Sequence, residues 1–166
     1  IKEKLVAWES KRSSITDIVE RYADSLEGGD EKEGAKIFFE KGAVACLKCH
    51  KVGDRGGDVG PDLSKIAEKN DKRALLEAIV DPNRKISQGF DSVVLALVDG
   101  RSVTGVLREE TDDNVVIYDA DAKRLVIPKA DIEERQRGKS AMPDDTVTKL
   151  TESELRDLVE YLSTRK

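Results

Sequence analysis

The sequence has 166 residues, of which 38% are hydrophobic and 38% are charged. This length and composition predict one domain of ordinary size, or a small domain with an insertion, beneath a heavily charged surface. The formal net charge of −5 gives no electrostatic basis for nucleic-acid binding, and no apolar run is long enough to span a bilayer. The chain begins at Ile1 without a methionine or a signal segment, so we expect a processed chain or a piece of a longer protein.

The N-terminal part has the hydrophobic spacing of helices. Residues 2–26 are predicted to form one or two amphipathic helices that end at Gly28, and we interpret residues 1–29 as a packing segment. A further helix is predicted for residues 31–41, with Asp30 as its N-cap. This helix leads directly to a cysteine motif.

The segment Cys46-Leu47-Lys48-Cys49-His50 contains both cysteines and the only histidine of the chain. The spacing Cys-x-x-Cys-His is typical of c-type haem attachment. Two thiols at this spacing reach the two vinyl groups of one porphyrin and become thioethers, and the adjacent His50 becomes the proximal ligand of the iron. The sequence therefore predicts one covalently attached haem c.

Other interpretations of the motif fit less well. A structural zinc site normally takes four Cys or His ligands, and this chain offers only Cys46, Cys49 and His50. A dithiol redox motif usually begins a helix after a strand, whereas here a predicted helix precedes the motif and a glycine-rich loop follows it. A purely structural role, with two buried cysteines and a histidine in the core, would not explain why all three residues lie in one pentapeptide.

After the motif, residues 53–63 contain four glycines and a proline. We expect no regular structure there, and a backbone that passes close to a flat ligand. A short helical stretch, residues 63–69, precedes a clearer helix at residues 72–80, which Asn70 or Asp71 caps and Asp81-Pro82 stops.

From Phe90 the hydrophobic period changes from that of a helix to that of a strand. Asp99-Gly100 is the signal of a two-residue hairpin, and the segment 88–136 is predicted to be a small barrel or a curled sheet. It contains no His, Cys or Met, which favours a structural or docking module. The predicted strands are residues 90–98, 101–109, 114–119, 123–128 and 132–136.

Met142, the only methionine, lies in the loop Ser140-Ala-Met-Pro143 just before the last predicted helix. That helix begins with a capping box formed by Thr151 and Glu154. A lone methionine often fills a gap in a core. Its place before a proline, in a haem protein without a second histidine, favours Met142 as the sixth ligand of the iron.

These motifs together resemble a class I cytochrome c. The resemblance rests on their order along the chain: Gly34-x-x-x-Phe38, the cysteine motif, Gly60-Pro61-Asp62-Leu63, Met142-Pro143 and the final amphipathic helix. More narrowly, the chain from about Asp30 to Leu162 resembles the haem-binding domain at the C-terminus of large planctomycete dehydrogenase-like proteins. That likeness is carried by residues 59–63, 75–82, 99–100, 127–134 and 140–143.

The resemblance implies a mainly α cytochrome c fold with an inserted small antiparallel β module, α+β overall. The cytochrome c domain would comprise residues 30–87 and 137–166, and the insertion residues 88–136. It further implies that the carbonyl of Pro61 accepts a hydrogen bond from His50 and tunes that ligand.

We therefore expect an electron carrier rather than an enzyme, with His50 and Met142 on the iron and no bound substrate. The resemblance implies the electron-accepting module of a larger, periplasmic or otherwise extracytoplasmic dehydrogenase, whose partner is a redox protein or a fused dehydrogenase domain. The alternative is a haem-based sensor or ligand-binding module with a labile Met142. A peroxidase is disfavoured because the chain has no distal histidine and one haem motif. Arg84, Lys85 and Arg137 are candidates for contacts with the haem propionates.

Overall fold

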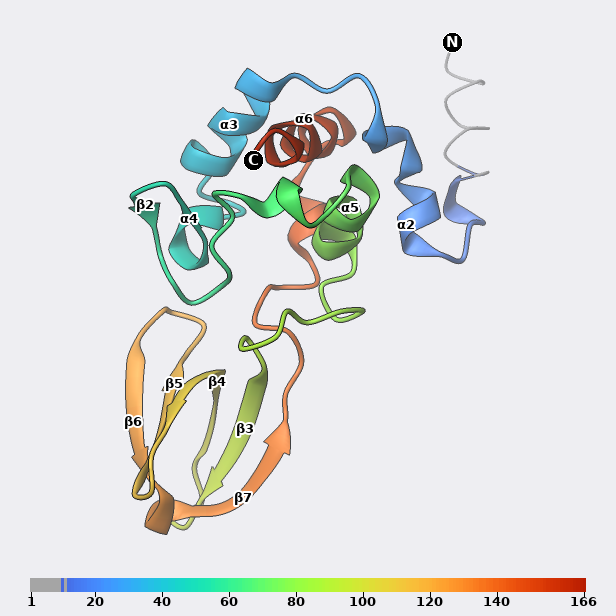
Figure 1. Ribbon diagram of the computed structural model, residues 1–166. Helices are drawn as coiled ribbons and strands as arrows, with labels where there is room; N and C mark the ends of the chain where they lie inside the picture. Colours follow the sequence, from blue (N-terminus) through green and yellow to red (C-terminus); the bar gives the residue numbers. More distant parts are fainter. Residues whose placement is uncertain (1–9, 11) are drawn as a thin grey trace.

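A computed structural model describes Ser10 and residues 12–166, so the expected start of the N-terminal helices lies outside the described residues. The described chain combines helices with an antiparallel sheet and is of the mixed α and β class (Figure 1). The α-helices are α2 (Ile18–Arg21), α3 (Glu31–Glu40), α4 (Cys46–Cys49), α5 (Lys72–Val80) and α6 (Glu152–Ser163). The 3-10 helices are η1 (Ala23–Leu26), η2 (Ile66–Glu68), η3 (Lys129–Asp131) and η4 (Thr146–Lys149).

The N-terminal segment is broken into short pieces. The Asp17 side chain accepts hydrogen bonds from the backbone N–H groups of Val19 and Glu20, so a new helix, α2, begins there. Val19 is buried in the core formed by α3, α5 and α6. The segment thus packs against the helical core.

The helical core is organised around α6, which packs against both α3 and α5. A Cβ atom placed on Gly34 of α3 would lie 1.9 Å from the carbonyl oxygen of Asp157 in α6, so this crossing requires glycine. Next to it, the ring centroids of Phe38 and Tyr161 are 5.6 Å apart. Large buried residues of this core include Leu76, Leu155, Leu158 and Val159.

The predicted helix ends are largely confirmed. Asp30 caps α3 by accepting from the N–H groups of Lys32 and Glu33, and Thr151 and Glu154 form the capping box of α6. Of the two candidate caps of α5 it is the Asp71 side chain that accepts, from the N–H of Ala74. Asn70 instead donates to the carbonyl of Ile66, which closes the end of η2.

The second body is a five-stranded antiparallel sheet in the order β6-β5-β4-β3-β7, which confirms the five predicted strands. Within the described chain β6 and β7 each pair with a single neighbour, so the sheet is open and not a closed barrel. Its strands are β3 (Ser92–Leu97), β4 (Ser102–Glu110), β5 (Asn114–Tyr118), β6 (Arg124–Pro128) and β7 (Ile132–Arg137). Its own small core consists of Val93, Leu95, Leu97, Val115 and Ile117.

Two local expectations were wrong. The hairpin at Asp99-Gly100 has a three-residue loop, because the N–H of Leu97 bonds to the carbonyl of Arg101 and Gly100 takes a left-handed φ of 83°. The glycine-rich segment after the motif does contain regular structure, a minimal hairpin of β1 (Lys51–Val52) and β2 (Arg55–Gly56).

The helical core and the sheet are joined by two chain segments, residues 81–91 leading out and residues 138–145 leading back (Figure 1). They lie side by side, because the N–H of Ser140 donates to Oδ1 of Asn83 over 2.9 Å. We call this pair of segments the neck. Met142 lies in its returning segment.

Candidate haem attachment site

The cysteine motif forms a single helical turn, α4. Ala45 enters it in the left-handed conformation, with φ 48°, and the N–H of His50 closes it on the carbonyl of Cys46 at 2.9 Å. Both cysteines are partly buried. Their spacing of three residues places them on the same side of the turn, as attachment to one porphyrin requires.

The glycine-rich loop is bound to this turn along its backbone. The N–H of Gly57 donates to the carbonyl of Leu47 over 2.9 Å, and the N–H of Gly60 to that of Cys49 over 2.7 Å. A Cβ on Gly57 would lie 2.3 Å from the Lys48 carbonyl oxygen, and one on Gly60 would lie 2.7 Å from Cε1 of His50. The glycines therefore allow the loop to pack flat against the motif and the histidine ring.

The His50 ring is oriented by Pro61, whose carbonyl oxygen lies 2.9 Å from Nδ1. A carbonyl only accepts, so Nδ1 carries the hydrogen and Nε2 keeps its lone pair. Burial lowers the pKa of His50, which favours the neutral ring at neutral pH. A neutral imidazole whose other nitrogen is held by a carbonyl is the form in which histidine binds metals.

The thiols differ from those of a dithiol redox site. Burial raises the pKa of Cys46 to about 11, and burial also raises the pKa of Cys49. Reactive redox thiols have lowered pKa values. Among the described residues there is also no cluster of three or more Cys, His, Asp or Glu side chains that could hold a metal ion.

Met142 is partly buried against the helical core that also supports the motif. Its backbone N–H donates to Oγ of Ser140 over 3.2 Å. Thr146, which is only 5% exposed, donates its hydroxyl to the carbonyl of Pro143 over 2.7 Å. The loop is therefore fixed on both sides of the methionine.

The apolar surroundings fit a porphyrin. Several apolar side chains pack against the helical core but are only partly buried. Their exposed apolar surface could be covered by a flat apolar group. These side chains include Val44, Cys46, Leu47, Val52, Leu63, Ile66, Met142 and Leu150.

The structure therefore brings the predicted site residues together. His50 is hydrogen-bonded to Cys46 through its backbone and to Pro61 through its ring, and Cys49 is hydrogen-bonded to Gly60, the neighbour of Pro61. Met142 lies on the same core. The candidates for propionate contacts are less favourable. Arg84 pairs with Asp17, Glu77 and Asp81, and Arg137 pairs with Asp91. Of these candidates Lys85 alone has no ion pair within the described chain, and it is exposed.

Sequence reasoning missed two groups of residues near the site. Asn83 and Thr146 hold the loop that contains Met142, and Asp121 of the sheet pairs with Lys48 of the motif. The hydroxyl side chains of Ser140 and Thr146 flank Met142-Pro143 in the sequence, and this local signal could have indicated that the loop is held by hydrogen bonds. No local signal indicates Asp121.

A single haem-binding turn with a neutral histidine, supported by an α-helical core, defines a site of the c-type cytochrome class. The family model for cytochrome c matches residues 31–115, from the first residue of α3 into β5. The matched range includes the cysteine motif and Pro61 and ends before Met142. A search of curated proteins found no significant match.

The chain belongs to the cytochrome c family. Its cofactor is covalent haem c, and the family places it among haem-binding electron-transfer proteins that work with a redox partner, in the role of electron carrier. In the part of the chain that the structure describes, no helix is long and apolar enough to cross a membrane.

Proposed function

We propose that the protein carries single electrons on one haem c that is bound through thioethers to Cys46 and Cys49 and ligated by His50 and Met142. The observation that supports this most is the contact between His50 and Pro61, because it leaves Nε2 free to bind the iron. Met142 is supported by its place on the same core and by a loop that is fixed at both ends.

When bound, haem c supplies a one-electron couple between ferric and ferrous iron. The chain's own residues set the conditions for that couple. Pro61 holds the His50 ring and would raise its basicity as a ligand, while the glycine loop packs against the ring. The thioether of Met142 favours the ferrous state and so raises the potential.

The wider setting of the proposal follows from the fold and the chemistry of attachment. Residues 30–87 and 137–166 would form a mainly α cytochrome c domain, and residues 88–136 the inserted β module. Because haem c is attached on the outer side of the bacterial cytoplasmic membrane, we place the protein in the periplasm or another extracytoplasmic space. The partner we propose is a dehydrogenase, fused or separate, that delivers its electrons to this haem.

A haem-based sensor is the second candidate, and the neck is the observation that favours it. Met142 follows the end of β7 at Arg137 by only a few residues, so a movement of the sheet would reach the methionine directly. In a sensor, Met142 would leave the iron readily and external ligands would bind fast.

The test is a redox titration of holoprotein made with a haem c maturation system, comparing the wild type with Met142→Leu. We expect the variant to have a lower potential, because the thioether ligand is lost, while Val98→Leu, a control at an exposed apolar residue of the β module, keeps the wild-type potential. An unchanged potential in Met142→Leu would rule out Met142 as a ligand. Rapid carbon monoxide binding by the reduced wild type would favour the sensor.

A further inference from the structure

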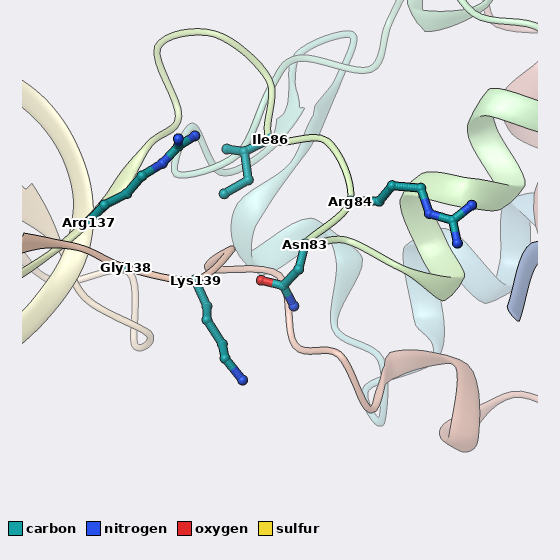
Figure 2. A pocket seen from close by; sticks show the side chains of 6 residues that line it. All are labelled: Asn83, Arg84, Ile86, Arg137, Gly138 and Lys139. Atoms are coloured by element: carbon teal, nitrogen blue, oxygen red, sulfur yellow. The ribbon is translucent and has the colours of Figure 1, made fainter. Parts of the chain in front are cut away.

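Asn83 and Ser140 connect the two segments of the neck. The side-chain oxygen Oδ1 of Asn83, in the outgoing segment, accepts a hydrogen bond from the backbone N–H of Ser140, in the returning segment, over 2.9 Å. Figure 2 shows Asn83 facing the returning segment near Gly138 and Lys139 across an open pocket. This bond closes the neck on the side of the helical core.

A second hydrogen bond links Ser140 to Met142. Oγ of Ser140 accepts from the N–H of Met142, which places the methionine backbone two residues from the Asn83 contact. Beyond Met142, Thr146 holds the carbonyl of Pro143 and leads into η4, whose Val147 is buried in the helical core. The Met142 loop thus has one anchor in the core and one in Asn83.

The residues on either side of Asn83 are tied to the helical body. Pro82, which precedes it, is buried, and Arg84, which follows it, is bound by carboxylates of α5 and of the N-terminal segment. Figure 2 shows the Arg84 side chain directed away from the pocket, toward α5. Asn83 is therefore fixed to the helical body and not to the sheet.

We propose that Asn83 is a positioning residue for the axial methionine: through Ser140 it keeps Met142 on the iron and isolates it from movements of the β module. This rests on the proposed ligation by Met142. Without this hydrogen bond, Asn83 would no longer hold the returning segment at Ser140, and a displacement of β7 would reach Met142 more easily. The ratio of bound to dissociated methionine should then fall.

The size of the effect follows from one lost hydrogen bond at an exposed site. We expect the ratio of bound to dissociated Met142 to fall about tenfold in Asn83→Ala, the ratio that corresponds to about 1.4 kcal/mol. Carbon monoxide binds to ferrous haem only after the methionine leaves, so its binding rate reports this ratio directly.

The experiment measures carbon monoxide binding to the reduced holoprotein by rapid mixing. Asn83→Ala and Ser140→Ala should each bind about tenfold faster than the wild type. Asn83→Asp keeps the acceptor oxygen and should stay within about twofold of the wild type. Gln88→Ala, which removes another exposed amide from the same segment, is the matched control and should leave the rate unchanged.

Met142→Leu separates the proposed ligation by Met142 from the proposed role of Asn83. In this variant no methionine has to dissociate before carbon monoxide binds, so binding should be fast. If Met142→Leu binds no faster than the wild type, the ligation is wrong. If Met142→Leu is fast while Asn83→Ala and Ser140→Ala match the wild type, the ligation stands and the role of Asn83 is wrong. Acceleration in Asn83→Asp equal to that in Asn83→Ala would also overturn the role, because the acceptor oxygen would then not matter.

Discussion

Lys48, which lies between the two cysteines of the haem motif, donates a hydrogen bond to Asp121 in the turn between β5 and β6 over 2.9 Å. This contact brings the tip of the sheet to α4, and Figure 1 shows that turn reaching toward the α4 and β2 region. The hydrogen bond with Asp121 raises the pKa of Lys48. The β module therefore contacts the cytochrome c part at the neck and again beside the attachment site.

Asp121→Asn should change how charged reductants reach the haem. Removal of the carboxylate leaves Lys48 unpaired, so the potential around the motif becomes more positive. We expect an anionic reductant to reduce the oxidised protein roughly twofold faster at low ionic strength, with the difference lost at high salt. Stopped-flow reduction over a salt series measures this, and Asp112→Asn, on the turn between β4 and β5, is the control. Equal reduction rates for Asp121→Asn and Asp112→Asn would show that the ion pair of Lys48 and Asp121 does not influence how the reductant reaches the haem.

Gly60→Ala should disturb the proximal histidine. The added Cβ would lie 2.7 Å from Cε1 of His50, so the ring must move away from Pro61. We expect a loss of about 1–3 kcal/mol in the free energy of unfolding of the holoprotein, together with a changed spectrum. Chemical denaturation followed by haem absorbance measures both. Gly42→Ala, where a Cβ meets no atom within 4 Å, should match the wild type.

Gly34→Ala should separate α3 from α6. Its Cβ would lie 1.9 Å from the carbonyl oxygen of Asp157, and backbone atoms cannot yield as a flexible side chain does. We expect a destabilisation of about 3 kcal/mol, visible as a lower midpoint in thermal unfolding. Lys32→Ala, on the exposed side of the same helix, should leave the midpoint nearly unchanged. A wild-type midpoint in Gly34→Ala would mean that the two helices do not cross this closely.

Glu154 should contribute a stability that depends on pH. The hydrogen bond from Lys41, at 2.5 Å, and then that from the Thr151 backbone lower the pKa of Glu154. A carboxyl with a lowered pKa in the folded state stabilises the protein above its unfolded pKa, and this contribution is lost as the pH falls through the folded value.

We therefore expect Glu154→Gln to be less stable than the wild type by about 0.5–1 kcal/mol at pH 7. The gap should begin to close at the ordinary glutamate pKa of about 4.3, and it should vanish once the pH lies below the lowered folded pKa of Glu154. Urea unfolding at a series of pH values measures the gap, with the exposed Glu133→Gln as control. A gap that is constant over this range would show that the charge of Glu154 is not its source.

Features set by residues close in sequence could be predicted. The cap Asp30, the capping box of Thr151 and Glu154 and the Cys46–His50 motif are each local, because their partners lie within a few positions. The hydrophobic period marked the five strands for the same reason. Local signals failed twice. A third residue joins the loop at Asp99-Gly100, and the short hairpin of β1 and β2 forms in a glycine-rich segment that carries no strand signal.

Features set by contacts distant in sequence could not be predicted. Asn83 and Ser140 are 57 positions apart, and Lys48 and Asp121 are 73 apart. Only the folded chain supplies these partners.

The most direct test of the proposed ligation is an absorption spectrum of the wild-type holoprotein, oxidised and then reduced. We predict a low-spin spectrum whose oxidised form has the far-red sulfur-to-iron charge-transfer band of histidine and methionine ligation. A high-spin spectrum without that band would contradict ligation by Met142 and would favour the haem-based sensor as the function.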